Sequence, residues 1–226
     1  MNAKAAPFSP EYIANIKQMI DSISLADQSA SISYPFIPFI DTSKRVAVVG
    51  LETRKWIDKL SSALEKGLDV AGIMDASIIE YCSYDACLKK RGQFAAMMKQ
   101  IESIFGEKPL WLNFFAFDFE DRTISRLKND SLKNSLMDRS VIKLTEELKI
   151  AKPEVIIFVG NYYNRFDLVA NKLTIKRDRR KVGKYFSEEW DNCLITRIPH
   201  PAARSVTNKS EIINENLNTI FKQWNQ

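Results

Sequence analysis

Four short apolar runs divide the chain, and between them apolar and polar residues alternate at helical spacing. The runs cover residues 45–50, 109–117, 154–160 and 194–198, and the most continuous of them read RVAVVG and EVIIFVG. Strands buried on both faces have this nearly unbroken apolar character, and such strands are usually parallel. Four of them alternating with helices predict an α/β fold, a single three-layer α/β/α domain with a central four-stranded parallel sheet.

The first helix is predicted to begin at Ser9-Pro10-Glu11, because serine caps a helix, proline suits its first turn and an acid favours its positive end. Its expected buried face consists of apolar residues at helical spacing, which are Ile13, Ile16, Met19, Ile20 and Ile23. The proline-stiffened segment 34–39 predicts an extended stretch that covers the core. We therefore expect residues 1–40 to pack on the domain as a helix followed by an extended segment.

Further helices are predicted over residues 54–66, 91–105, 135–151 and 208–224, and another begins at residue 161. Ile142 is expected on or near the buried side of the third of these. The helix over residues 91–105 carries a stripe of methionine and phenylalanine side chains that starts at Phe94. Such a stripe at helical spacing indicates core packing rather than a cofactor site.

Composition restricts the class of protein. Of the 226 residues, 45% are hydrophobic and 27% charged, with no repeat or linker, so one domain is expected over residues 1–226. The three cysteines, Cys82, Cys87 and Cys193, cannot all pair, which favours a reducing compartment. With one histidine they also predict no metal site and no cofactor. Without a signal-like start or a membrane-length apolar run, we expect a cytoplasmic monomer that does not bind membranes.

Polar residues stand where the predicted strands end. Glu52 follows the first strand, Asn113 lies in the second, Gly160 ends the third, and His200 follows the fourth. His200 is the only histidine, and prolines on both sides stiffen its loop. Ligands of parallel α/β sheets sit beyond the carboxyl ends of the strands. We therefore expect the Glu52 carboxylate and the His200 imidazole to face the same cavity.

These residues, in this order, resemble the motifs of the uracil-DNA glycosylase superfamily. VAVVG followed by Glu52 is similar to its first motif, and LITRIPHPAARS around His200 is similar to its second. Between them, LWLN at Asn113 and FVGNYY at residues 158–163 match two further strand ends. The resemblance covers residue 45 to the end of the chain, and the cysteine count points to a branch without an iron–sulfur cluster.

The resemblance implies a DNA glycosylase that hydrolyses the N-glycosidic bond of a flipped-out uracil or modified base. Glu52 would stabilise the sugar cation and position water, while His200 would donate a hydrogen bond to the departing base. Asn113 would pair with the edge of the base, and Phe114, Tyr81 or Tyr84 would stack on it. A mildly basic net charge of +5 is compatible with DNA as the partner.

Departures from the family pattern change the expected substrate. Thr53 and Arg54 replace the proline and tyrosine that exclude thymine, so Arg54 is a candidate donor to a base with a C5 substituent, such as those of modified phage DNA in antiviral defence. Ala202 replaces a phosphate-binding serine, for which Ser205 is a nearby substitute, and Arg204 holds the position of the wedge residue. Candidate phosphate contacts lie in the basic segment 172–184 and are Lys176, Arg177, Arg179 and Arg180.

Other interpretations stay open. The chain could be a catalytically inactive glycosylase fold that binds DNA or a protein, or another small-molecule α/β enzyme, although neither a Walker loop nor a serine elbow is present. Glu52 could cap a following helix, Asn113 could satisfy buried backbone groups, and the basic segment 172–184 could be a solvated loop.

Overall fold

The computed structural model of the chain describes residues 8–53, 56–86, 92–160, 171, 175–177, 184–187, 193–203 and 207–226. The predicted strands are present as β1 (Val46–Gly50), β2 (Leu110–Asn113), β3 (Val155–Val159) and β6 (Leu194–Ile198). They are neighbours in one sheet and form its parallel part, so the predicted α/β class is confirmed. In this sheet Val155 of β3 lies opposite Val46 of β1 and opposite Leu194 of β6.

Two short strands that were not predicted extend the sheet. These are β4 (Ile175–Arg177) and β5 (Lys184–Ser187), and the strand order is β2-β1-β3-β6-β5-β4. β5 pairs antiparallel with β6, and β4 pairs antiparallel with β5. The alternative interpretation of segment 172–184 as a solvated loop therefore does not hold for β4 or for the first residue of β5. Antiparallel strands near a sheet edge need no continuous apolar run, because one of their faces can meet water.

The parallel strands end together at one edge of the sheet. Val49 of β1 lies opposite Phe158 of β3, and Val159 of β3 lies opposite Ile198 of β6. The N–H of Gly160 donates to Ile198 O at 2.8 Å. Its φ of 117° is a value that glycine adopts without a steric penalty. The chain thus leaves β1, β3 and β6 at the same edge, as predicted.

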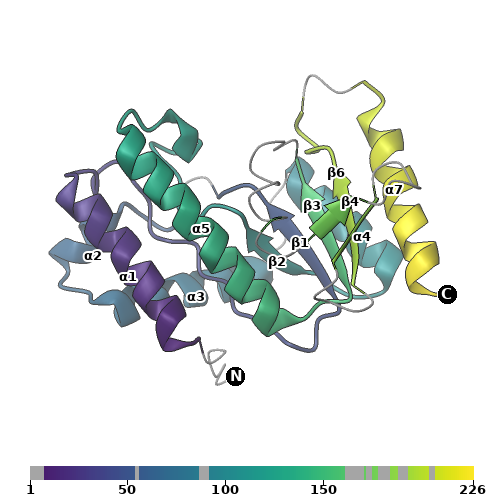
Figure 1. Cartoon of the computed structure of the whole chain (residues 1–226), viewed down its shortest axis with the longest axis horizontal. Coiled ribbons are helices and arrows are strands. Elements are labelled where there is room, and N and C mark those ends of the chain that lie inside the picture. The colour runs from purple at the N-terminus through teal and green to yellow at the C-terminus, as the bar shows by residue number, and fades with distance from the viewer. Residues whose placement is uncertain are drawn as a thin grey trace. The chain divides into compact units, whose positions relative to one another are not determined.

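The chain divides into two compact units, the second of which contains the sheet except for Asn113 at the end of β2. The first comprises Met1–Ile40, Leu51–Cys87 and Asn113–Glu147, and the second comprises Asp41–Gly50, Leu88–Leu112 and Leu148–Gln226. Within the second unit, α7 (Lys209–Trp224) packs beside β6, and α4 (Gln93–Phe105) packs on α7 (Figure 1). A single domain over residues 1–226 stays a prediction.

Aromatic and charged side chains hold α7 against the rest of the second unit. The ring of Phe105 on α4 lies 5.5 Å from the rings of both Phe221 and Trp224. The indole N–H of Trp224 donates to Glu154 Oε2 at 2.6 Å, and the guanidinium of Arg45 lies 4.3 Å above the Trp224 ring. Hydrogen bonds from Arg45 and Trp224 lower the pKa of Glu154. These contacts hold the end of α7 against the starts of β1 and β3.

The first unit is mainly helical. It contains α1 (Pro10–Leu25), α2 (Leu60–Glu65), α3 (Val70–Ala86), the short 3-10 helix η1 (Ile124–Arg126) and most of α5 (Asp130–Ala151). α1 begins where predicted, since Ser9 Oγ accepts the N–H of Tyr12 at 3.1 Å. The predicted start of a helix at residue 54 is wrong, because α2 begins at Leu60 and is six residues long.

Two apolar residues expected in the core are exposed. Ile13 of α1 is 41% exposed and Ile142 of α5 is 38% exposed. The buried face of α1 carries Tyr12 and Asn15 instead of Ile13. Successive helical residues differ by about 100° in direction, so a helix that buries Tyr12 turns Ile13 toward its edge. Spacing alone did not determine where this buried face is centred.

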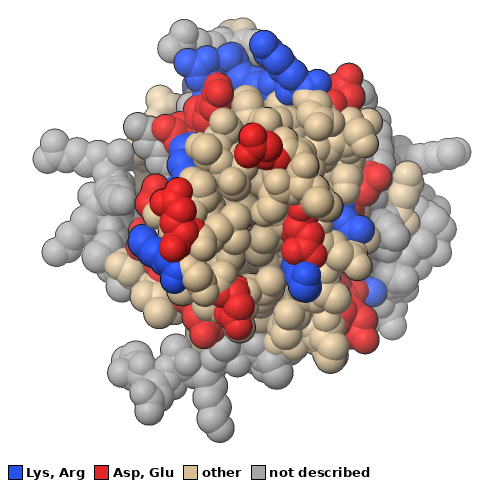
Figure 2. Space-filling model, turned by 90° about the vertical axis from the view of Figure 1, so that its left-hand side faces the viewer, with Lys and Arg blue, Asp and Glu red and all other residues tan. Residues whose placement is uncertain are grey.

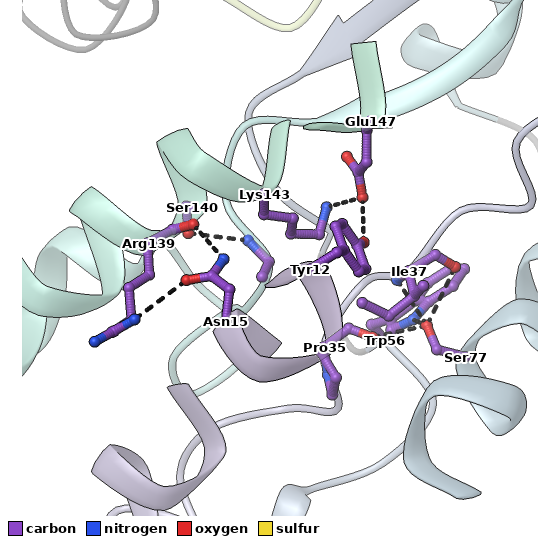
Figure 3. Close-up of polar contacts among 11 residues, drawn as sticks. Tyr12, Asn15, Pro35, Ile37, Trp56, Ser77, Arg139, Ser140, Lys143 and Glu147 are labelled. Atoms are coloured by element: carbon purple, nitrogen blue, oxygen red, sulfur yellow. Dashed lines mark hydrogen bonds and ion pairs between the residues drawn. The ribbon is translucent and has the colours of Figure 1, made fainter. Parts of the chain in front are cut away.

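The extended segment 34–39 covers the core, as predicted, and Ser77 of α3 holds it in place. The Ser77 hydroxyl accepts the Ile37 N–H at 2.8 Å and the Trp56 indole N–H at 2.9 Å, and it donates to Pro35 O at 2.7 Å (Figure 3). Ser77 is fully buried. One hydroxyl therefore satisfies three buried polar groups where the segment meets α3.

A buried ion pair on α5 is hydrogen-bonded to α1 in the same unit. Lys143 Nζ lies 2.6 Å from Glu147 Oε1, one turn away, and both side chains are 0% exposed. The Tyr12 hydroxyl of α1 donates to the same Oε1 at 2.7 Å, and Lys143 Nζ lies 5.5 Å from the centre of the Phe36 ring (Figure 3). Burial lowers the pKa of Lys143 and raises that of Glu147, while each partner's charge opposes the shift. The two groups are thus kept away from water, and the charged form of each depends on the charge of the other.

Candidate functional site

His200 lies in a tight turn directly after β6 and is half-buried. Its carbonyl oxygen accepts the N–H of Ala203 at 2.8 Å, and its ring Nδ1 accepts the N–H of Ala202 at 3.0 Å. Because Nδ1 acts as an acceptor, the neutral imidazole carries its proton on Nε2. The turn thus makes His200 a hydrogen-bond donor at the carboxyl edge of the sheet.

Two aromatic side chains of the second unit accompany this imidazole. Phe94, in the first turn of α4, has its ring centre 6.3 Å from that of His200, with the two planes 19° apart. The ring of Trp111 on β2 lies 5.7 Å from that of Phe94. Phe94 is half-buried, whereas Met97, Met98 and Ile101 of the same stripe are buried as predicted. The first member of the predicted core stripe therefore contacts the candidate site.

Glu52 belongs to the first unit, in the segment that follows β1. The N–H of Phe115 donates to Leu51 O at 2.8 Å, so the segments after β1 and after β2 lie side by side. Glu52 is half-buried, and its Oε2 accepts the N–H of Ile124 at 3.2 Å, at the start of η1. The carboxylate thus caps a short helix, though one that lies 72 residues further along the chain. That Glu52 and His200 face the same cavity stays a prediction.

The candidate base-binding residues of the first unit lie in its core. Asn113, the last residue of β2, is 1% exposed, Phe114 is 0% exposed and Tyr81 is 4% exposed. The Phe114 ring packs edge-to-face on Phe115 at 4.9 Å, and Tyr81 packs edge-to-face on Phe36 at 5.8 Å. Burial this complete favours a core role for the two aromatic rings. Their stacking on a base stays a prediction.

Several candidate residues lie outside the described part of the chain. These are Arg54, Arg179, Arg180, Arg204 and Ser205, together with the helix predicted from residue 161. For Lys176 and Arg177 the structure describes the backbone of β4. No family model and no curated protein matches this chain. The function therefore has to be argued from the site.

Asp118 is a buried acid that the sequence analysis missed. Its side chain is 0% exposed, and neither carboxylate oxygen has a hydrogen bond of normal geometry to the described residues. Burial raises the pKa of Asp118, and the nearby positive charge of Lys59 opposes this effect. Its backbone N–H donates to Ser33 Oγ at 3.2 Å. An aspartate within the apolar stretch FFAFDF was the available signal.

Charge on the described surface is mixed. Figure 2 shows one face, on which acidic and basic side chains surround a centre with few charges and the basic ones gather at the top of the view. This mixture is typical of a solvated surface. Within the described residues, no group of three or more His, Cys, Asp or Glu could hold a metal ion. No described helix combines the length and apolar character that a membrane span needs.

Proposed function

We propose that this chain is a DNA glycosylase that hydrolyses the N-glycosidic bond of a flipped-out uracil or modified base. The observation that carries the proposal is the His200 turn. It presents an Nε2–H donor at the carboxyl edge of a parallel sheet, because the Ala202 N–H occupies Nδ1. The ordered motifs around Glu52, Asn113, Gly160 and His200 support the same function.

The reaction requires two charges to be stabilised. As the bond from C1′ to the base breaks, positive charge develops on the sugar and negative charge on the base. His200 donates its Nε2–H to the base oxygen, as an oxyanion-hole donor does. Phe94 lies in the first turn of α4, so the positive end of this helix is close to the imidazole and also favours an anion there.

Glu52 serves the sugar side of the reaction in this proposal. Its carboxylate stabilises the developing cation and orients the water whose oxygen bonds to C1′, while the departing base takes up a proton. The hydrogen bond from the Ile124 N–H holds the side chain in one orientation. In this proposal the basic segment 172–184 binds DNA phosphates. β4 lies within this segment and pairs with β5, which pairs with β6.

The experiment measures base release. Single-stranded and duplex oligonucleotides with one uracil or one C5-modified pyrimidine are incubated with the protein, and abasic sites are cleaved with alkali. His200→Ala and Glu52→Gln should each slow release by about 100- to 1,000-fold. Glu52→Gln is informative because the amide oxygen can still accept the Ile124 N–H, so the charge is removed and the cap is kept. Glu102→Gln, an exposed position on α4, is the matched control.

A second candidate is an inactive glycosylase fold that binds DNA or a protein. The Ile124 N–H bond to Glu52 favours it, because this bond gives the carboxylate a structural use without chemistry. Retained DNA binding with no base release from any substrate would support this candidate and refute the glycosylase. Mass spectrometry of bases freed from natural and phage DNA extends the test to substrates outside the oligonucleotide panel.

A further inference from the structure

The position of Phe94 bears on how His200 is held. Its ring has two aromatic neighbours, with the centre of Trp111 at 5.7 Å and the centre of the His200 imidazole at 6.3 Å. Trp111 is 8% exposed and belongs to β2, so Phe94 packs on a buried side chain of the sheet. Phe94 itself is half-buried in the first turn of α4. The imidazole is therefore connected to the sheet through two aromatic contacts.

The two restraints on the imidazole act in different directions. The hydrogen bond from the Ala202 N–H fixes Nδ1 within the plane of the ring, at 3.0 Å. By itself this bond still allows the imidazole ring to turn about the axis from Ala202 N to His200 Nδ1. Phe94, whose ring plane is 19° from that of the imidazole and whose centre is 6.3 Å away, is an offset neighbour that limits this turn. Together the restraints determine the direction of the Nε2–H bond.

We propose that Phe94 is a positioning residue for His200. It fixes the plane of the imidazole, so that Nε2–H points at the acceptor oxygen before the ligand arrives. A donor held in place in advance stabilises developing charge without having to reorient during the reaction. The consequence for catalysis rests on the proposed glycosylase function, whereas the effect on the imidazole does not.

The single histidine makes the test specific, because a protein labelled with ¹⁵N-histidine gives imidazole signals from His200 alone. Phe94→Leu and Phe94→Met remove the ring, and Phe94→Tyr retains it. Phe221→Leu is the matched control, because Phe221 is also half-buried and packs on aromatic side chains, Phe105 and Trp224. Circular dichroism establishes that each variant is folded. If Phe94→Leu does not fold, Phe94→Met takes its place.

Wild type should show the Nε2–H tautomer, with imidazole carbon-bound protons displaced by the ring current of Phe94. Removal of the ring should abolish this displacement and lower the order parameter of the imidazole, while the tautomer stays Nε2–H because the Ala202 N–H still occupies Nδ1. Phe94→Tyr and Phe221→Leu should keep the wild-type spectrum and order parameter. On a DNA substrate, removal of the ring should lower kcat about three- to tenfold with little change in KM. Phe94→Tyr should restore kcat.

The outcomes separate the two proposals. An imidazole order parameter that is unchanged in both Phe94→Leu and Phe94→Met would overturn the positioning role, whatever the activity. An altered spectrum together with unchanged kcat would overturn its catalytic consequence. If wild type releases no base but the spectra change as expected, the glycosylase proposal fails and the positioning of His200 by Phe94 is supported.

Discussion

Lys143→Met tests whether the buried pair on α5 is charged. The substitution removes the ammonium that lies 2.6 Å from Glu147 Oε1 and leaves that carboxylate 0% exposed, with the Tyr12 hydroxyl as its remaining donor. Removing one member of a buried ion pair typically costs about 3–5 kcal/mol of stability, because the other charge is left uncompensated. The free energy of unfolding should therefore fall strongly.

The pH sets an upper limit on the electrostatic part of this loss. Once its partner is gone, Glu147 can take up a proton, and protonating a carboxyl of ordinary pKa 4.5 at pH 7 costs about 3.4 kcal/mol. Each unit by which the pH is lowered reduces this cost by about 1.4 kcal/mol. The expected loss is thus about 3 kcal/mol at pH 7 and under about 1 kcal/mol near pH 5.

The chain offers a closely matched control at its surface. Lys17 and Asp21 of α1 have the same i,i+4 spacing and the same 2.6 Å separation, but their side chains are 60% and 49% exposed. Lys17→Met should cost less than about 0.5 kcal/mol. In the triple variant Tyr12→Phe, Lys143→Met, Glu147→Leu, apolar groups replace the whole network, and this should recover most of the stability.

Urea unfolding at pH 7 and pH 5, followed by circular dichroism, measures these differences as shifts of the midpoint at constant slope. A loss for Lys143→Met no larger than that for Lys17→Met would refute the reasoning. So would a loss that stays the same between pH 7 and pH 5, because the pair would then be neutral in the folded wild type.

Three further predictions follow from single groups. Asp118→Asn should make the protein more stable at neutral pH and leave stability unchanged below about pH 3.8, because a raised pKa means that wild-type stability falls as pH rises from the unfolded to the folded value. Urea unfolding across this pH range measures the effect, with the exposed Asp138→Asn of α5 as the control. Burial raises the pKa of the Cys193 thiol to about 12, so this thiol should be alkylated far more slowly in the folded protein at pH 8 than in urea. Peptide mass spectrometry measures the alkylation rate of each cysteine, and equal rates in the two conditions would contradict the burial of Cys193. Lys176→Gln should reduce the slope of log affinity for DNA against log salt by about 1, and a slope equal to that of the control Lys17→Gln would remove β4 from the DNA-binding surface.

Local chemistry was sufficient for much of the fold. The start of α1 depends on Ser9 and Pro10, which lie next to the helix that they initiate, and β1 and β3 are buried along their whole length as their apolar runs predicted. Strands β4 and β5 were missed because they are short and depend on pairing with β6 rather than on apolar runs of their own. The exposure of Ile13 could not be predicted either, because it depends on which face of α1 meets its neighbours.

The candidate site shows the same division. The sequence alone placed Glu52 and His200 directly after parallel strands, because strand ends follow from hydrophobic patterning. Only the tertiary structure showed that Glu52 accepts the Ile124 N–H, that Nδ1 of His200 is occupied, and that Phe94 faces the imidazole. Burial and hydrogen-bond partners depend on groups far apart in the chain or on the geometry of a turn. The pattern of apolar and polar residues along the sequence specifies neither of these. The sequence therefore determined which residues could act, and the tertiary structure decided how they are held.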